Sequence, residues 1–216
     1  MERTRRDYPV KPKVKPFYEL VKRVFDVVFS LALMLLLWPL FVVVIVLVRA
    51  DGGPAFYRQV RVGKDGKPFT LIKFRSMVVD ADSPEMLALV ESLNEQDGPA
   101  FKSRKDPRIT SIGRFLRKTS IDELPQLINI LRNEMTVVGP RPPLVKETEH
   151  YDDYQRQRLG VKQGLTCFWQ CSGRNNLSFD EWVELDLDYI EQRGFWTDLK
   201  ILFKTVPAVL TGEGAS

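Results

Sequence analysis

The sequence has few of the residues that build disulfide frameworks and metal centres. Its 216 residues include two cysteines, Cys167 and Cys171, and one histidine, His150. Two cysteines cannot form the several bridges of a disulfide-stabilised fold, and one histidine cannot build a histidine metal site. We expect the cysteines to be reduced and structural, and His150 to lie at the surface.

A large excess of charge of one sign is also missing. Thirty-two Lys and Arg residues against 28 Asp and Glu residues give a formal net charge of +4. This excess is too small to indicate a nucleic-acid partner by itself, and we expect none. Apolar residues make up 44% and charged residues 28% of the chain. These values exclude disorder of the whole chain and are typical of one globular domain with an appendage.

The apolar residues are concentrated in one run near the N-terminus. Of the 22 residues over 27–48, only Ser30 and Pro39 are not apolar. The run is long enough to cross a bilayer core of about 30 Å. It is too long for a signal peptide and lacks a small-residue cleavage site, and it has no polar face as a core helix would. The run therefore predicts insertion into a membrane.

Pro39 divides this run, and both flanks of the run are basic. Because proline cannot donate to the carbonyl four residues back, we expect a break or a kink there. Basic flanks stay in the cytoplasm, so we favour a re-entrant helix that enters and leaves on that side. A kinked span remains the alternative, since proline is tolerated in membrane helices. The basic residues are Arg3, Arg5, Arg6, Lys11, Lys13, Lys15, Lys22 and Arg23 before the run, and Arg49, Arg58, Arg61, Lys64 and Lys67 after it.

The pattern predicts a basic segment over residues 1–23, a membrane helix over 24–48 broken at Pro39, and a cytoplasmic domain over 49–216. In this domain, runs 55–62 and 68–75 predict a β-hairpin. Helices are expected over 85–93 after Ser83, over 111–118 after Thr110, from Ser120 to about Arg132, and from Ser178 to about Gln192. Three prolines and a glycine predict a stiff extended loop over 137–143. The fold class is therefore α+β and mostly helical, and the stretch 195–210 is a core helix or an interfacial amphipathic helix.

The residues over 120–123 combine a helix start with two carboxylates. Ser120 and Glu123 have the spacing of a capping box, so Asp122 would lie in the first turn of a helix, where the dipole lowers a carboxylate pKa. Free N–H groups there can also hold phosphate oxygens. An ionised carboxylate beside guanidinium groups is what attack on a phosphoryl group requires. Alone, such a motif more often only compensates the helix dipole. The nearby basic residues, which share one side of the preceding helix, are Arg114, Arg117 and Lys118.

Four further segments support the catalytic interpretation of Asp122. They are KFRSM at 73–77, GRFLRKTSIDELPQ at 113–126, VGPRP at 138–142 and GRN at 173–175. Following one N-terminal membrane segment, they resemble the bacterial sugar transferase family over residues 22–210. These are monotopic phosphoglycosyl transferases that start glycoconjugate assembly on a polyprenol phosphate. The resemblance implies that Asp122 attacks the β-phosphate of a UDP-sugar, releases UMP, and passes the sugar phosphate to undecaprenyl phosphate.

The resemblance also implies roles for other residues of this chain. Glu123 would bind Mg²⁺, and a further carboxylate would come from the helix around 184–189, which we place at Asp186 with Asp188 as the competitor. At the membrane break, the family often has Ser-Pro where this chain has Trp38-Pro39. The basic residues expected at the substrate are Lys73, Arg75, Arg114, Arg117, Arg141 and Arg174.

The resemblance implies three partners: a UDP-sugar, undecaprenyl phosphate and the bilayer, with downstream glycosyltransferases acting on the product. The implied location is the cytoplasmic face of the bacterial inner membrane. A phosphatase or lipid kinase would need a P-loop or a Cys/His nucleophile motif, and the sequence has neither. A non-catalytic, membrane-anchored protein that binds anionic ligands is the remaining alternative, and a test for UMP release separates the two.

Overall fold

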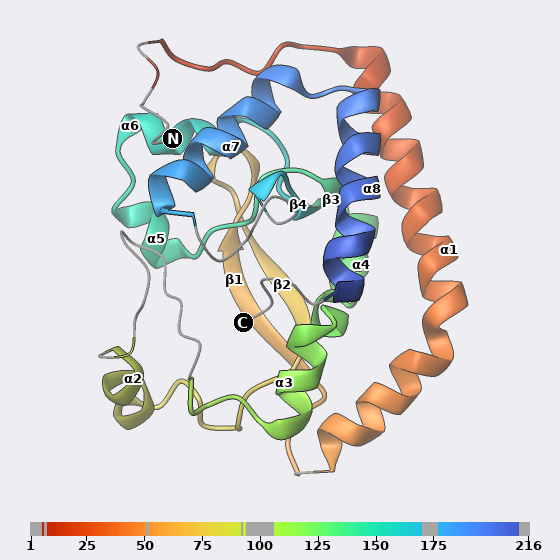
Figure 1. Cartoon of the computed structure of the whole chain (residues 1–216), viewed down its shortest axis with the longest axis vertical. Coiled ribbons are helices and arrows are strands. Elements are labelled where there is room, and N and C mark those ends of the chain that lie inside the picture. The colour runs from red at the N-terminus through yellow and green to blue at the C-terminus, as the bar shows by residue number, and fades with distance from the viewer. Residues whose placement is uncertain are drawn as a thin grey trace.

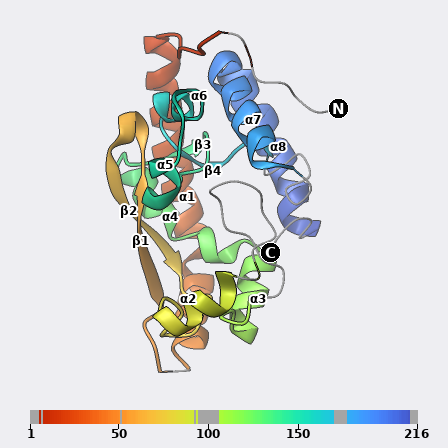
Figure 2. The same ribbon diagram turned by 90° about the vertical axis from the view of Figure 1, so that its left-hand side faces the viewer.

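The described part of the protein is mostly helical, with the small sheet of β3 and β4 near its centre and the β1–β2 hairpin along one side (Figure 1 and Figure 2). The structure is a computed structural model, and it describes residues 6, 8–50, 52–91, 93, 106–169 and 177–211. The α+β class and the hairpin are confirmed. The helices are α1 (Pro16–Arg49), α2 (Pro84–Glu91), α3 (Ser111–Lys118), α4 (Gln126–Leu131), α5 (Val145–Glu149), α6 (Asp153–Arg156), α7 (Phe179–Gln192) and α8 (Phe195–Thr211). The strands are β1 (Phe56–Val62), β2 (Pro68–Phe74), β3 (Thr136–Val138) and β4 (Gly164–Thr166).

Helix α1 runs along one whole side of the molecule and bends in its lower, C-terminal part (Figure 1). Its 34 residues stay helical, with Pro39 inside the helix. Among the described residues, it is the one helix long and apolar enough to cross a membrane, and 11% of its most apolar window is buried. Many of its apolar side chains are therefore exposed, whereas Phe29, Leu33, Met34 and Phe41 pack partly against the domain.

Both ends of α1 are attached to the same globular domain. Near the N-terminal end, Arg23 donates to the carbonyls of Ile130 and Leu131 at the end of α4, at 2.6 and 2.9 Å. Asp26 accepts hydrogen bonds from the Thr136 hydroxyl and the Val137 N–H of β3, at 2.7 and 2.9 Å. Near the C-terminal end, a buried cluster joins α1 to β2 and α3, and its buried members are Val44, Val48, Phe74 and Leu116.

The hairpin of β1 and β2 is antiparallel, and its register pairs Phe56 with Phe74 and Val62 with Pro68. Asp65 and Gly66 take positive φ values of 56° and 77° in the connecting turn, a conformation that glycine and aspartate tolerate best. The end of β1 is also tied to the proline-rich loop, because the Val62 N–H donates to the Pro143 carbonyl at 3.0 Å. This contact holds the loop beside the hairpin.

The stretch 137–143 was expected to be an extended loop, and the structure corrects its first residues. Val137 and Val138 belong to β3, which pairs in parallel with β4. The two backbone segments approach very closely after β3: a Cβ added to Gly164 would lie 2.1 Å from the Gly139 nitrogen. The partner of Thr136 in this pairing is Gly164, which lies 28 residues further along the chain. Local sequence could therefore not indicate the pairing.

The expected helix from Ser120 to Arg132 is wrong in its first part. Ser120 has φ of +55° and its side chain makes no capping hydrogen bond, so the predicted capping box is absent. Ile121–Glu123 forms a single 3₁₀ turn, and α4 begins only at Gln126. The reason is Pro125, which has no N–H to donate to the Ile121 carbonyl and so interrupts a continuous α-helix; the Leu124 N–H donates to that carbonyl instead, at 3.2 Å.

Helices α7 and α8 lie on the side of the molecule opposite the hairpin (Figure 2). The capping box of α7 is confirmed, since the Glu181 N–H donates to the Ser178 hydroxyl at 3.2 Å and the Ser178 N–H donates to the Glu181 carboxylate at 2.8 Å. The main core lies between these helices, α4 and the small parallel sheet. The exposed large apolar residues of α8 are Phe195, Trp196, Phe203 and Val206.

Candidate active site

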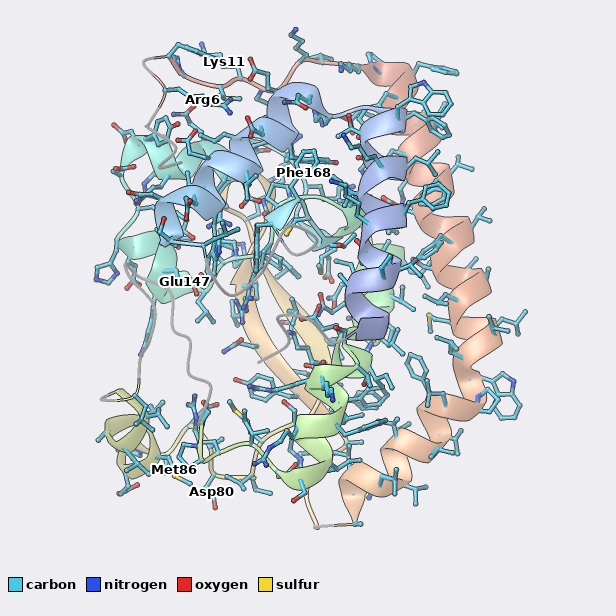
Figure 3. All side chains as sticks on the ribbon, viewed as in Figure 1. Arg6, Lys11, Asp80, Met86, Glu147 and Phe168 are labelled. Atoms are coloured by element: carbon cyan, nitrogen blue, oxygen red, sulfur yellow. The ribbon has the colours of Figure 1, made fainter. Side chains whose placement is uncertain are left out.

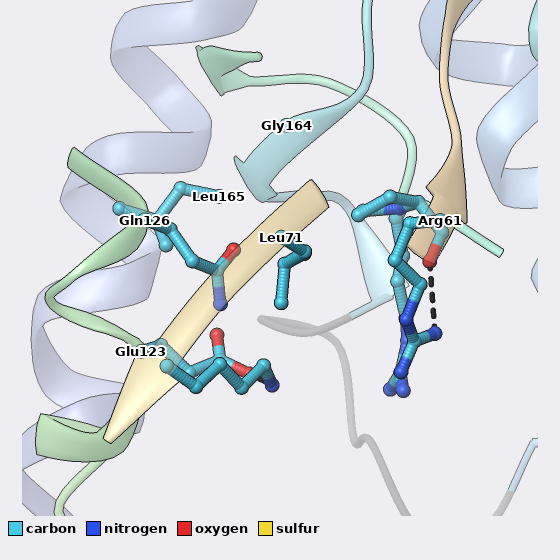
Figure 4. Close-up of a pocket in the computed structure, with 9 residues that line it drawn as sticks. Arg61, Leu71, Glu123, Gln126, Gly164 and Leu165 are labelled. Carbon is cyan, nitrogen blue, oxygen red and sulfur yellow. Dashed lines mark hydrogen bonds and ion pairs between the residues drawn. The ribbon is translucent and has the colours of Figure 1, made fainter. Parts of the chain in front are cut away.

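A pocket with about 270 Å³ of open space lies between the hairpin, the turn before α4 and the proline-rich loop (Figure 4). This volume includes open solvent at the mouth of the pocket, so the pocket is an open depression rather than an enclosed cavity. Three of the lining residues are cationic and one is a carboxylate. The lining residues are Arg61, Leu71, Lys73, Glu123, Gln126, Arg141, Pro142, Gly164 and Leu165.

Lys73 and Glu123 form an ion pair on one wall of the pocket. Lys73 lies on β2 and Glu123 in the turn before α4, and the Lys73 Nζ is 2.7 Å from the Glu123 Oε1. Both side chains remain partly exposed, at 21% and 27%. The structure therefore brings together two residues that are 50 positions apart and that the resemblance places at the substrate.

Asp122 precedes Glu123 in the sequence. Its side chain is buried, and it is not among the residues that line the pocket. Burial raises its pKa from 3.8 to about 6; the charges of Lys73 and Arg117 oppose this shift and that of Glu123 adds to it. The expected lowering by a helix dipole is therefore wrong, because Asp122 lies in a 3₁₀ turn and loses its water. The turn begins at a non-glycine residue in the left-handed region, Ser120, which is a strain that functional sites often hold.

The Arg117 side chain extends from α3 toward Ser76, which follows the C-terminal end of β2. Its Nε donates to the Ser76 hydroxyl at 2.9 Å. Burial lowers its pKa, and the charge of Asp122 works in the opposite direction. Helix α3 can approach Ser76 because residue 113 is glycine: a Cβ there would lie 1.9 Å from the Ser76 carbonyl oxygen. The Thr110 hydroxyl caps the helix as expected, accepting from the Gly113 N–H at 3.0 Å.

Arg61 and Gln126 line the pocket although sequence analysis did not select them as site residues. Arg61 was counted only among the basic residues that flank the membrane run. The alternation of residue types in β1 gave no signal, because Arg61 stands between Val60 and Val62 and would be expected on the polar face, whereas the structure buries it against the proline-rich loop. A buried arginine in a hairpin strand needs a partner, and this indicates a site.

Several expected site residues lie elsewhere. Arg75 donates to the carbonyls of Pro54 and Val48, so it caps the end of α1. Arg114 is exposed on α3 and does not line the pocket. Arg174, like Cys171, lies outside the described residues. Cys167 is buried and His150 exposed, as expected.

Asp186 and Asp188 of α7 both pair with arginines. Asp186 is completely buried and forms an ion pair with Arg158. Asp188 forms an ion pair with Arg6, which lies over α7 (Figure 3). Neither carboxylate lines the pocket, so in this structure the expected extra carboxylate is engaged away from Glu123.

Comparison with known proteins decides the family. The family model for "Bacterial sugar transferase" matches residues 17–212. The chain belongs to this family. Residues 73–77, 113–126 and 138–142, which carry the resemblance, all lie inside the matched region of this bacterial sugar transferase.

Curated relatives of this bacterial sugar transferase differ in length. It is 52% identical to a galactosyl transferase, CpsE, of Streptococcus agalactiae, over 78% of this chain and 37% of the relative. It is 44% identical to an undecaprenyl-phosphate galactose phosphotransferase of Salmonella typhimurium, over 90% of this chain and 41% of the relative. The chain thus spans about two fifths of the length of these relatives. It is 42% identical to the exopolysaccharide production protein ExoY of Rhizobium meliloti, over 94% of this chain and 91% of the relative.

Proposed function

We propose that this chain transfers a sugar 1-phosphate from a UDP-sugar to undecaprenyl phosphate and releases UMP. The observation that carries the proposal is one pocket in which Arg61, Lys73 and Arg141 converge beside the Asp122–Glu123 pair. Cations arranged in this way fit a substrate with several phosphate charges. The names of relatives support this chemistry, since the Salmonella protein is an undecaprenyl-phosphate galactose phosphotransferase and a 37% identical Caulobacter vibrioides relative is a UDP-glucose:undecaprenyl-phosphate glucose-1-phosphate transferase.

The first step is a displacement at the β-phosphorus of the donor. A carboxylate oxygen of Asp122 attacks that phosphorus, the bond to the bridging oxygen breaks, and UMP leaves with the electron pair. Because Asp122 is buried, the turn at 121–123 must open toward the pocket when the donor binds. Lys73 and Arg117, the two cations that act most strongly on Asp122, favour its ionised and nucleophilic form.

The second step regenerates the aspartate. An oxygen of undecaprenyl phosphate attacks the phosphorus of the aspartyl phosphosugar, and the phosphorus–oxygen bond to Asp122 breaks. The carboxylate is released as the leaving group, so the product carries a diphosphate between lipid and sugar. An acyl phosphate is energetic enough for this transfer, and the two-step route lets the soluble donor and the lipid acceptor use one nucleophile in turn.

Magnesium fits the donor set of this pocket. No group of three or more potential ligand residues is found in the part of the chain that the structure describes. Mg²⁺ usually needs only one or two protein carboxylates, with substrate phosphates and water completing its shell. Glu123, partly exposed in the pocket, would hold the ion with Asp122 as its neighbour. When bound, the ion would neutralise diphosphate charge and stabilise the leaving UMP.

We infer a re-entrant membrane topology from the two attachments of α1. Residues 22–26 bond to α4 and β3, whereas Val44 and Val48 pack against β2 and α3. A charged domain cannot pass into the hydrocarbon, so both attachments lie on one side of the bilayer. The apolar run between them must enter and return, and the basic flanks favour the cytoplasmic side of the inner membrane.

Helix α8 supplies a second membrane contact in this proposal. Trp196 and Phe203 are 77% and 70% exposed, and Lys200 and Lys204 are exposed on the same helix. Exposed aromatic and basic residues on one helix are typical of binding in the headgroup region. Together with α1, this helix would keep the pocket near the lipid phosphate.

The experiment that tests the function is isotope exchange without the lipid. Purified enzyme, UDP-galactose or UDP-glucose, Mg²⁺ and labelled UMP should give labelled UDP-sugar in the absence of undecaprenyl phosphate. Asp122→Asn should abolish the exchange, since a neutral amide does not attack. If exchange requires the lipid acceptor, or persists in Asp122→Asn, direct transfer replaces the covalent route.

A further inference from the structure

One wall of the pocket carries two guanidinium groups without a carboxylate partner. Among the described residues, no carboxylate oxygen lies within 4.0 Å of Arg61 or Arg141. On the opposite wall, Glu123 neutralises Lys73. In Figure 4, Arg61 lies across the pocket from Glu123 and Gln126. The positive charge that has no direct ion pair is therefore concentrated on the arginine wall, where Glu147 acts on Arg61 only at longer range.

Hydrogen bonds hold the Arg61 guanidinium in place, but they do not use all of its N–H donors. Its Nε and Nη2 donate to the Gln59 Oε1 at 3.0 and 2.7 Å, and its Nη1 donates to the Pro142 carbonyl at 3.1 Å. A guanidinium has five N–H groups, so these three bonds leave two donors. Gln59 thus fixes the plane of the group, and a planar fork with free donors is suited to two oxygens of one phosphate.

Arg141 and Arg61 repel each other in this arrangement. Burial lowers the pKa of Arg61 to about 10, and the charge of Arg141 is the second cause. The Arg141 guanidinium lies 5.9 Å from the centre of the Trp169 ring, a cation–π contact, and its carboxylate interaction is with the buried Asp186, which already pairs with Arg158. An anion bound between the two arginines would remove the repulsion and replace the lost water.

We propose that Arg61 contacts the substrate, and that Arg61 and Arg141 together form a receptor for a phosphate dianion. The proposal rests on the proposed function, because the reaction presents two such groups. One is the terminal phosphate of the nucleotide and the other is the phosphate of the lipid acceptor. Their shared chemistry is a doubly charged phosphate monoester, which forms charge-assisted hydrogen bonds with a guanidinium fork.

The test compares charged ligands with neutral ligands of the same shape. Arg61→Gln and Arg61→Lys are prepared in the full chain in lipid nanodiscs, with Arg58→Gln as the matched control from the exposed face of the same strand. Binding of UMP and of uridine is measured by calorimetry, and the KM for undecaprenyl phosphate is measured with saturating UDP-sugar. Melting temperatures are recorded for every variant.

We expect Arg61→Gln to melt normally and to lose at least tenfold in affinity for UMP, with uridine binding unchanged. This result identifies the nucleotide phosphate as the bound group; a tenfold rise in the KM for undecaprenyl phosphate with unchanged UMP binding identifies the lipid phosphate instead. Arg61→Lys should recover part of the loss, because it keeps the charge without the fork. Arg58→Gln should behave like the unmodified protein.

Two results would overturn the proposal. One is a folded Arg61→Gln protein with unchanged UMP affinity and unchanged KM for the lipid. The other is an equal loss for UMP and uridine, because that indicates a role only in holding the loop at Pro142. If Arg61→Gln does not fold, the same comparison is made with Arg61→Lys. UMP binding does not require turnover, so a protein that binds UMP through Arg61 but transfers no sugar phosphate refutes the proposed function alone.

Discussion

At the scale of single residues, the buried carboxylate of Asp122 is the most consequential group. We expect Asp122→Asn to lose activity and at the same time to stabilise the fold near pH 7. The charged form is penalised by burial, and a pKa raised from 3.8 to about 6 corresponds to a cost of about 3 kcal/mol at roughly 1.4 kcal/mol per pKa unit. A neutral amide of the same shape avoids part of this cost. Thermal unfolding at pH 7 measures the effect, and a fall in melting temperature would mean that Asp122 serves the fold.

The same residue predicts the pH dependence. A raised pKa means that the folded state binds its proton more tightly than the unfolded state, so the stability from Asp122 is present below pH 4 and is lost as pH rises through about 6. The nucleophilic form appears over the same range. We expect kcat/KM for the UDP-sugar to fall below about pH 6, and the stability advantage of Asp122→Asn to disappear at pH 4. A profile that stays flat down to pH 4.5 would contradict the raised pKa.

The residue scale also shows where sequence reasoning stops. Asp122 and Glu123 stand out by residue type and position, whereas Lys73 and Arg141 were selected through the resemblance to the family; the structure brings Lys73, Glu123 and Arg141 to one pocket. Arg75 belongs to the same segment as Lys73 but points to the end of α1, because β2 ends at Phe74 and the position of α1 decides the partner of Arg75. The direction of such a side chain depends on tertiary contacts, which the spacing of residues in the sequence does not reveal.

At the scale of secondary-structure elements, the close approach of α3 to Ser76 gives a third prediction. A Cβ at residue 113 would lie 1.9 Å from the Ser76 carbonyl oxygen, so Gly113→Ala must push α3 away. We expect a loss of about 1–3 kcal/mol in the free energy of unfolding, as in overpacked sites. Activity should also fall, because Arg117 would lose its bond to Ser76. Gly160→Ala is the control, since its Cβ meets nothing closer than 3.4 Å.

The network around Asp198 gives a fourth prediction, for the attachment of α8. Asp198 accepts from Lys22 and Tyr18 of α1, at 2.6 and 2.8 Å, and from Tyr189 of α7 at 2.9 Å. Lys22 and Tyr189 also donate to the Val138 carbonyl, just before the loop that carries Arg141. Asp198→Ala removes the carboxylate partner of Lys22. The two side chains are 11% and 13% exposed, so we expect a loss near or below the lower end of the about 3–5 kcal/mol that breaking a fully buried pair costs.

Denaturant unfolding in detergent measures this loss. Asp80→Ala is the control, because Asp80 is exposed and lies beside α2 at the far end of the molecule from the start of α8 (Figure 3). A change of less than 1 kcal/mol in Asp198→Ala would show that the network does not hold α8 to α1.

Elements were predictable from sequence where the signal was local. The hairpin, α3 with its Thr110 cap and α7 with its capping box follow from alternation and from residues three positions apart. The helix expected from Ser120 failed because Pro125 and the left-handed Ser120 outweighed the capping-box spacing. The parallel pairing of β3 with β4 could not be predicted, because its hydrogen bonds join two segments that are separated in the sequence by α5 and α6.

At the scale of the whole molecule, α1 is attached to one domain at both ends, and the re-entrant topology proposed above rests on these attachments. Between the attachments at Asp26 and Val44, many of its apolar side chains are exposed, and in the proposed topology lipid covers them. If α1 spanned the bilayer as a straight helix, one of its ends would lie on the far side of the membrane. That end would lose its contacts with the domain, which are the hydrogen bonds of Arg23 and Asp26 at one end and the packing of Val44 at the other. The bend in α1 lets both remain.

The fifth prediction therefore concerns accessibility of the two ends of α1. Single cysteines at Val14 and Ala50, both exposed, are placed in a chain whose native Cys167 and Cys171 are replaced by alanine. In intact cells neither should react with a membrane-impermeant thiol reagent, and both should react after the membrane is opened. Pro39→Ala should straighten the helix and make part of the population reactive at one end from outside. If the chain with Pro39 intact is labelled from outside at one position only, α1 spans the membrane, and the domain contacts at one of its ends must be given up in the bilayer.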